Sequence, residues 1–409
     1  MSLSINHNYK ILIVTPDFYP EIGGYSHAVT NFSRFLASKG HLIHILTFTQ
    51  LGEKKEIKEE NIRVYRLKRM NIIKGLNLFF NEYRIANFIN KLDKKNNYDF
   101  ILFETGELPF ALFLCLSFLK KEHKTGIRIH AATETEITVF EKGFYHRVRY
   151  FFIKKIFKKI RFILSTSSYY LDFVNKYYLN ENPLIIGKKI EAVIPNIIYE
   201  EKESKQNLFT YKLEEGKIFF LTLGRMNYVG FIQKGIQDIL ISLFFLKNKD
   251  YFEKLQLIVI GDGEYREKLI KFSQTLGIEK QVKFIKSLSN SEVQQLQSKV
   301  STVILASRFE GCSMFALESL KNGAPLIFSN VGGIKDMVKP NFNGLLFEPH
   351  NPFDLAEKID FFINHMLTQI ETLRENSKKL YKERFDPELT YRKFMDILEV
   401  IISVQKSKM

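Results

Sequence analysis

The sequence predicts an α/β protein with two domains, each built on a parallel sheet. Its 409 residues are more than one hydrophobic core comfortably holds. Short runs rich in Ile, Val, Leu and Phe alternate with longer stretches of helical periodicity, which is the pattern of stacked βα units. This alternation occurs twice, on either side of a polar stretch from Pro195 to about Glu215. We interpret that stretch as the linker between the domains.

Strands are expected wherever the apolar runs are short. In the first half they are residues 10–15, 42–47, 62–66, 99–103, 126–130, 162–165 and 191–194. In the second half they are residues 218–223, 256–261, 282–285, 303–305 and 325–329. Helices are expected between most of them, and residues 387 to about 403 are predicted to form one more amphipathic helix.

The composition favours an anionic partner and a reducing compartment. Sixty Lys and Arg residues against 45 Asp and Glu give a formal charge of +15, which suits phosphate-bearing ligands, anionic lipid or nucleic acid. Cys115 and Cys312 are the two cysteines, too few for the disulfide framework of a small secreted protein. The polar start lacks the apolar region of a signal peptide, and the apolar stretch 108–119 is too short to span a bilayer. We expect a cytoplasmic protein.

The turn after the first strand contains Gly23 and Gly24, followed by a helix. Two glycines at a helix start let backbone N–H groups approach an anion closely, and the helix dipole favours negative charge there. A phosphate or sugar could dock on this turn. The alternative is that the pair only makes a tight turn.

Two cationic residues follow the first strand of the second half. Gly224-Arg225 and then Lys234 lie between a strand and a helix, where they could neutralise a diphosphate without a metal. Solvated surface cations are the alternative. Gly263, in the turn after the next strand, is expected to line a nucleotide crevice; Arg266 occupies the place of the third glycine of an NAD fingerprint.

The segment 307–318 carries two carboxylates eight residues apart. Glu310 is expected in a loop and Glu318 on the helix that follows, so that both could face one ligand. Glu318 could accept hydrogen bonds from a vicinal diol such as ribose, whereas the alternative is a merely solvated carboxylate. The loop amides expected to face phosphates and sugar belong to Gly311, Cys312, Ser313, Met314 and Phe315.

Two further features remain open between a functional and a structural interpretation. His130 ends a strand, where open α/β sheets bind ligands, although a histidine there often only makes structural hydrogen bonds. Residues 142–164 are rich in Lys and Arg with apolar residues at helical spacing, which suits an anionic membrane surface or a helix packed on the core. No Asp-x-Asp pair and no Cys/His cluster occurs, so a metal site is not expected.

Together these features resemble the family 4 glycosyltransferases, a retaining family of the GT-B fold, over nearly the whole chain. The E-x7-E pair followed by "NGAPLIFSNVGG" is the most specific part. The matching segments are Gly23-Gly24, Val193 to Asn196, Gly224-Arg225, Lys234-Gly235, Val259 to Leu269, Glu310 with Glu318, and residues 329–349. Ile197, Ala306, Cys312-Ser313 and the wide spacing of Arg225 and Lys234 depart from the family pattern.

The resemblance implies two Rossmann-like, doubly wound domains facing a central cleft. Their boundaries would be 1–198, completed by the helix 387–409, for the acceptor and 199–386 for the nucleotide-sugar donor. It also implies that Arg225 and Lys234 bind the diphosphate, Glu318 the ribose, Glu310 the transferred sugar and Gly24 the phosphates. By the same resemblance, His130 would lie near the reacting centre.

The implied reaction is sugar transfer from a nucleotide-diphosphate sugar, with UDP expected, to a glycan or lipid-linked acceptor. Retention without an enzymic nucleophile suggests front-face attack, and no metal or other cofactor is expected. The enzyme alternatives are a sugar-nucleotide epimerase or a glycogen-synthase-like polymerase. A different class is a catalytically degenerate nucleotide- or polyanion-binding protein. Nucleic acid is not expected as a partner, since no nucleic-acid motif accompanies the basic residues.

Overall fold

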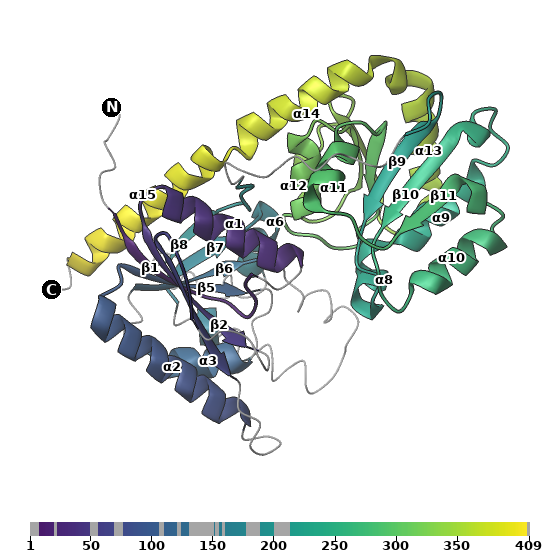
Figure 1. Ribbon diagram of the computed structural model, residues 1–409. Helices are drawn as coiled ribbons and strands as arrows, with labels where there is room; N and C mark the ends of the chain where they lie inside the picture. The colour runs from purple at the N-terminus through teal and green to yellow at the C-terminus, as the bar shows by residue number, and fades with distance from the viewer. Residues whose placement is uncertain are drawn as a thin grey trace. The chain divides into compact units, whose positions relative to one another are not determined.

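The computed structural model describes residues 8–19, 23–49, 56–68, 77–105, 110–120, 124–130, 151, 155–157, 160–176, 189–199 and 213–406. The chain forms two compact units (Figure 1). The N-terminal unit comprises Met1–Tyr199 with Pro387–Met409, and the C-terminal unit comprises Glu200–Asp386.

The N-terminal unit is built on one sheet whose described strands run in the order β3-β4-β2-β1-β5-β6-β7-β8. Its pairs are parallel except β3 with β4, which is antiparallel. The strands are β1 Lys10–Val14, β2 Leu42–Thr49, β3 Glu56–Glu59, β4 Ile62–Lys68, β5 Phe100–Thr105, β6 Thr125–Ile129, β7 Phe162–Ser165 and β8 Ile190–Val193. The described helices are α1 Gly24–Ser38, α2 Asn77–Asn96, α3 Phe110–Ser117, α6 Ser168–Val174 and α15 Pro387–Lys406.

Strand periodicity divides the core of this unit between the two faces of the sheet. Ile11 and Ile13 of β1 pack with residues of α1 and α15, whereas Leu12 and Val14 pack with residues of α2 and α3. Successive side chains of a strand point to opposite faces, so a strand covered on both sides must be apolar throughout. Figure 1 shows α1 and α2 on opposite sides of the sheet.

The last helix of the chain belongs to the first unit. Phe394, Leu398 and Ile401 of α15 are fully buried there, and the Phe394 ring meets that of Phe32 edge-on at 5.2 Å. The predicted helix that crosses back to the first domain is therefore confirmed.

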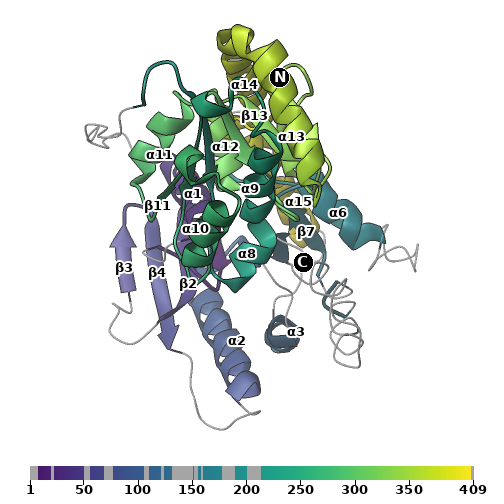
Figure 2. The ribbon, with the colours of Figure 1, turned by 90° about the vertical axis from the view of Figure 1, so that its right-hand side faces the viewer.

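The C-terminal unit contains a parallel sheet with described strands in the order β11-β10-β9-β12-β13-β14. They are β9 Ile218–Leu223, β10 Leu255–Ile260, β11 Val282–Ile285, β12 Thr302–Leu305, β13 Leu326–Ser329 and β14 Gly344–Phe347. Its α-helices are α8 Tyr228–Lys234, α9 Ile236–Phe245, α10 Arg266–Thr275, α11 Asn290–Gln297, α12 Met314–Lys321, α13 Pro352–Phe361 and α14 Ile370–Arg384 (Figure 2). Shorter helical turns are η3 Phe252–Lys254, η4 Glu279–Gln281, η5 Ile334–Met337, η6 Phe362–Met366 and η7 Leu367–Gln369.

The predicted class, two doubly wound α/β domains on parallel sheets, is confirmed. Four details differ from the expectation: β3, β14 and helix α8 were not predicted, and Pro195 to Ile198 of the expected linker lie buried in the N-terminal unit. Residues 200–212 of that linker lie outside the described residues. No helix in the described part of the chain combines the length and apolar character needed to cross a membrane.

Candidate active site

The carboxyl end of β9 carries the first two predicted site residues. Gly224 directly follows the strand, and the exposed Arg225 comes next. A Cβ on Gly224 would lie 2.9 Å from Cγ of Lys234 and 3.1 Å from its Cβ. Glycine is thus required because the stem of Lys234 lies directly against the backbone of the β9 loop.

Helix α8 explains how Lys234 returns to a place beside Arg225 despite their wide separation in sequence. The intervening residues form this short helix, whose N-cap Asn227 accepts a hydrogen bond from the backbone N–H of Gly230. Gly235 then ends α8 with φ of 59°, and a Cβ there would lie 2.2 Å from the carbonyl oxygen of Ala306. Only glycine fits this left-handed, tightly packed position.

Lys234 forms an ion pair with Glu310, the first predicted carboxylate. Its Nζ lies 2.7 Å from Oε2 of Glu310, and the two side chains are 16% and 13% exposed. Glu310 lies in the loop between β12 and α12, and its carbonyl oxygen accepts a hydrogen bond from the backbone N–H of Gly333. The structure therefore brings an acid and a base together at the carboxyl ends of β9 and β12, where open α/β sheets bind ligands.

Gln233 connects these groups and was not predicted. Its amide nitrogen donates to the carbonyl oxygen of Phe309 at 3.3 Å and to Oε2 of Glu310 at 3.4 Å. Its amide oxygen accepts from Arg225 Nη2 at 3.3 Å. Arg225, Gln233, Lys234 and Glu310 consequently form one hydrogen-bonded cluster, which we call the cation cluster. No sequence signal marks Gln233 except its place before the predicted Lys234.

The predicted amide loop precedes helix α12. Ser313 is the N-cap of this helix, and its side chain accepts from the backbone N–H of Ala316. Cys312, Ser313, Met314 and Phe315 are all buried, as is Gly311. The segment is therefore fixed by packing and by its cap, with a helix N-terminus that favours an anion.

Glu318 is buried in the middle of α12, among apolar neighbours. It is 5% exposed, and burial raises the pKa of its carboxyl group to about 7, against the opposing effect of Lys321. The structure thus places the two predicted carboxylates on successive parts of one loop–helix segment, one in an ion pair and one desolvated.

Gly263 lies in the turn after β10, as predicted. With φ of 145°, its added Cβ would lie 2.3 Å from the carbonyl carbon of Met226. Met226 N–H also donates to the carbonyl oxygen of Asp262. This glycine is needed for close packing of two loops at the carboxyl ends of β9 and β10.

In the N-terminal unit, Gly23 and Gly24 begin α1. A Cβ on either residue would meet nothing described within 4 Å, so packing against the described residues does not require glycine here. On the same helix, the Tyr25 ring meets the ring of His130 edge-on at 4.9 Å. The predicted turn and the predicted histidine are therefore neighbours.

His130 follows β6 and is bonded to a carboxylate that the sequence analysis did not single out. Its Nε2 lies 2.6 Å from Oε2 of Glu104, whose Oε1 accepts from Arg128 at 3.2 Å. The His130 side chain is 6% exposed and the other two are 0% exposed. Arg128 also donates to Asn196 at 3.1 Å and stacks on the ring of Phe32 at 4.0 Å. The structural interpretation of His130 accordingly holds in part: it does make a buried hydrogen bond.

Most of the basic segment 142–164 lies outside the described residues. Of the rest, Ile156, Phe157 and Ile160 are buried in the core of the N-terminal unit, and residues 162–164 belong to β7. Phe151 is 52% exposed, with Lys155 4.6 Å from its ring centre. The described apolar positions thus favour the core-packed alternative for the part near β7.

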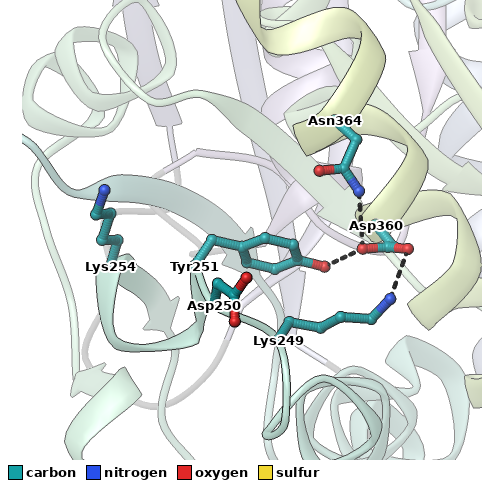
Figure 3. Close-up of a pocket in the computed structure, with 6 residues that line it drawn as sticks. All are labelled: Lys249, Asp250, Tyr251, Lys254, Asp360 and Asn364. Atoms are coloured by element: carbon teal, nitrogen blue, oxygen red, sulfur yellow. Dashed lines mark hydrogen bonds and ion pairs between the residues drawn. The ribbon is translucent and has the colours of Figure 1, made fainter.

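A polar hollow elsewhere in the C-terminal unit contains none of the predicted residues. Figure 3 shows Tyr251, Lys249 and Asn364 converging on Asp360. Lys249 and Asn364 donate to it at 2.9 Å and 3.0 Å, and Tyr251 donates as well. These bonds tie the loop before β10 to α13. The described residues contain no group of three or more side chains suited to a metal ion.

Comparison with known proteins identifies related sequences. Residues 203–380 match the family model described as "Glycosyl transferases group 1". An uncharacterized glycosyltransferase of Methanocaldococcus jannaschii is 25% identical, over 96% of this chain and 99% of the relative. The alpha-monoglucosyldiacylglycerol synthase of Streptococcus pneumoniae is 24% identical over 86% and 77%, respectively. The lipopolysaccharide 1,6-galactosyltransferase of Salmonella typhimurium is 31% identical, but over 44% of this chain and 48% of the relative.

Solved structures of similar fold cover almost the whole chain. Sucrose-phosphate synthase from Thermosynechococcus elongatus superposes with a TM-score of 0.74 at 16% identity, over 97% of this chain and 100% of that one. Anabaena HepE in complex with UDP gives a TM-score of 0.69 at 16% identity, over 96% and 100%. At these identities the likeness concerns the fold, and the predicted GT-B fold is confirmed.

Proposed function

We propose that this chain, whose residues 203–380 match the group 1 glycosyltransferase model, transfers a hexosyl-type sugar from UDP-sugar to a glycan or lipid-linked acceptor with retention of configuration. The observation that carries this proposal is the cation cluster at the carboxyl ends of β9 and β12. It offers two cations to a diphosphate and one carboxylate to a sugar within a single hydrogen-bonded group. A UDP donor is supported by the UDP complex of the structurally similar HepE.

The proposed donor contacts follow the chemistry of each group. Arg225, as a planar fork, and Lys234, as a point charge, bind the diphosphate. Glu310, already beside Lys234, accepts hydrogen bonds from the transferred sugar. Glu318 binds the ribose diol as a carboxylate.

The remaining proposed contacts are made by backbone groups. The buried, capped start of α12 supports the role of Gly311, Cys312, Ser313, Met314 and Phe315 in presenting amides to the donor. Gly224 and Gly263 allow the loops of β9 and β10 to pack closely beside it. Gly23 and Gly24 offer the open turn of α1 to the phosphates.

In the proposed reaction the acceptor hydroxyl attacks the anomeric carbon from the face that the diphosphate leaves. The bond from that carbon to the diphosphate oxygen breaks, and a phosphate oxygen takes the proton of the hydroxyl. Arg225 and Lys234 stabilise the charge that develops on the leaving diphosphate, the role otherwise given to a metal ion. We propose that no metal or other cofactor is used.

The acceptor and the cellular location are proposed from the relatives and the composition. The relatives named for lipopolysaccharide and glucosyldiacylglycerol synthesis support an envelope glycan or glycolipid acceptor. The net charge of +15 suits the inner face of an anionic membrane, reached from the cytoplasm. The two cysteines, Cys115 and Cys312, are both buried, and two are too few for the disulfide framework of a small secreted protein.

A thermal-shift screen against UDP, GDP, ADP and their sugars, with EDTA present, tests the proposal. A ligand that binds only the folded state at about 100 times its Kd stabilises that state by about 2.7 kcal/mol, a shift of several degrees. We expect UDP and one UDP-sugar to give this shift, and sugar transfer to continue in EDTA. Arg225→Ala should abolish the UDP shift, whereas Lys249→Ala, a cation of the hollow in Figure 3, should retain it.

Three results would count against the proposal. If no nucleotide raised the melting temperature, the polyanion-binding or catalytically degenerate alternative would be favoured. Epimerisation of a nucleotide sugar without transfer would favour an epimerase. Activity lost in EDTA and restored by Mg²⁺ would contradict the metal-independent mechanism.

A further inference from the structure

The buried residues beside His130 include a carboxylate, Glu104, and a guanidinium, Arg128. A histidine that made only a structural hydrogen bond would not need both charges. Glu104 of β5 and Arg128 of β6 are both 0% exposed and lie 3.2 Å apart. A lone buried charge is strongly unfavourable, but an ion pair with additional hydrogen bonds offsets that cost. Arg128 also donates to Asn196 and lies over the ring of Phe32. The negative charge of Glu104 is thus balanced by Arg128, without any charge on His130.

This balance fixes the protonation of both partners. Burial raises the pKa of a carboxyl group, but Arg128 and His130 together hold the pKa of Glu104 below its usual range. Burial, helped by the positive charge of Arg128, lowers the pKa of His130 in spite of Glu104. At neutral pH the group therefore holds one carboxylate, one guanidinium and one neutral imidazole.

The position of the imidazole hydrogen then follows from the contact. An ionised carboxylate only accepts hydrogen bonds, so at 2.6 Å Nε2 of His130 must be the donor. A neutral ring with hydrogen on Nε2 has Nδ1 as an acceptor. Nδ1 makes no hydrogen bond to any residue that the structure describes. The Tyr25 ring, packed edge-on against His130, further restricts the rotation of the imidazole.

We propose that Glu104, held in place by Arg128, is a positioning residue that directs Nε2–H of His130 into the domain and leaves Nδ1 as the acceptor for a hydroxyl group of the bound sugar or acceptor. This inference rests on the proposed function, because it assigns the role by which His130 serves that reaction. The ligand class for Nδ1 is a saccharide hydroxyl group, which is neutral and donates one hydrogen bond.

Glu104→Gln tests the proposal because it keeps the size of the side chain. An amide can donate to Nε2 and so stabilise the other tautomer, in which Nδ1 is no longer an acceptor. We expect kcat to fall about 10- to 100-fold, with KM for the donor within about twofold. Among the residues that the structure describes, the titratable and charged groups facing His130 are Glu104, Arg128 and Tyr25, so loss of the carboxylate leaves a net positive neighbour. The pKa of His130 then falls further, and the acid limb of the kcat/KM profile moves to lower pH.

Two comparisons separate positioning from a merely structural role. Asp93→Asn makes the same chemical change in another buried ion pair of this unit, in which Asp93 lies 2.6 Å from Lys124 at the opposite end of β6. It should lower stability and leave kcat per folded molecule unchanged. In a His130→Ala background, Glu104→Gln should have no further effect on kcat. Unchanged kcat in Glu104→Gln, or additive effects in the double variant, would overturn the proposal.

A second readout does not depend on finding the substrate. Nitrogen-15 NMR of histidine-labelled protein, with the His130 signals assigned by loss in His130→Ala, reports which ring nitrogen carries the hydrogen. Hydrogen on Nε2 in the wild type and increased Nδ1–H in Glu104→Gln support the proposal. Hydrogen on Nδ1 in the wild type overturns it. If the protein were inert toward every nucleotide sugar, the proposed function would be contradicted. The NMR measurement would still decide which tautomer His130 adopts.

Discussion

At the scale of single residues, the Glu318 carboxylate lowers the stability of the C-terminal unit but is proposed to bind the donor. Its carboxyl group is 5% exposed on an otherwise apolar helix, and burial raises its pKa to about 7. The folded protein therefore binds a proton between about pH 4.5 and 7 that the unfolded chain has already released. Stability falls as pH rises through that window, because the folded state binds more protons there. A carboxylate in this place destabilises the unit that it is proposed to serve.

We predict that Glu318→Gln stabilises the C-terminal unit at pH 8 and weakens UDP binding. The amide avoids the cost of a desolvated charge, which is on the order of 1–3 kcal/mol. It also loses the second acceptor oxygen proposed for the ribose diol. Urea unfolding at pH 5 and pH 8 and calorimetric titration with UDP measure the two effects.

The wild type provides the internal control, since its UDP affinity should weaken below about pH 7 as Glu318 takes up a proton. The variant should lack that pH dependence. Equal stability of the two proteins at pH 8, or an unchanged UDP affinity in the variant, would contradict the assignment.

Residues that act through contacts across the sheet could not be predicted. Glu104 lies in an apolar strand, where the sequence shows one acid without its partners. Arg128 and His130 reach it because β5 and β6 are neighbours in register, with Glu104 opposite Arg128. Gln233 likewise becomes part of the cation cluster only when α8 folds back toward the β12 loop. The motif residues were recognisable because each follows a strand in the sequence.

At the scale of elements, the junction of α8 and α9 positions Lys234. Gly235 ends one helix and begins the next with φ of 59°, and a Cβ there would lie 2.2 Å from the carbonyl oxygen of Ala306. A side chain here would push α8 away from the start of the Glu310 loop. Lys234, one residue earlier, would move with it.

We predict that Gly235→Ala destabilises the C-terminal unit by several kcal/mol and lowers kcat/KM at least about tenfold. The positive φ costs about 1 kcal/mol, and the 2.2 Å contact adds displacement of the backbone. Gly216→Ala is the matched control, since Gly216 has φ of 79° with nothing within 4 Å of an added Cβ. It should cost about 1 kcal/mol and leave activity unchanged. Chemical unfolding measures the loss of stability, and steady-state kinetics measures the loss of kcat/KM. Equal losses in Gly235→Ala and Gly216→Ala would refute the argument.

Most strands were predictable because parallel strands covered on both faces are continuous apolar runs. The two that were missed lack that signal. Strand β3 has the sequence EIKE and lies antiparallel at the edge, where polar residues are tolerated. Strand β14 begins with Gly344, a residue type depleted in strands, although a Cβ there would lie 1.9 Å from the carbonyl oxygen of Leu326. Helix α8 was missed because Gly230 weakens its helical pattern, although that glycine is needed where a Cβ would lie 2.1 Å from the carbonyl oxygen of Arg225.

At the scale of the whole molecule, the two ends of the chain share one unit. Helix α15, the last of the described elements, contributes Phe394, Met395, Leu398 and Ile401 to the core that strand β1 begins. The N-terminal unit thus becomes complete only after the entire C-terminal unit has been synthesised. Its stability should therefore depend on the last twenty or so residues, while the stability of the C-terminal unit should depend on donor binding.

Phe394→Ala tests this division of stability between the two units. Removing a fully buried aromatic side chain costs about 3–5 kcal/mol, and this ring also contacts Phe32 at 5.2 Å. We expect calorimetry to resolve two transitions, one lowered by the substitution and the other raised by UDP. Exposed Val400 on the same helix gives the control, since Val400→Ala should change neither transition by more than about 0.5 kcal/mol. If UDP raised the same transition that Phe394→Ala lowers, the donor site and helix α15 would belong to one cooperative unit, and the assignment of the main nucleotide contacts to the C-terminal unit would be wrong.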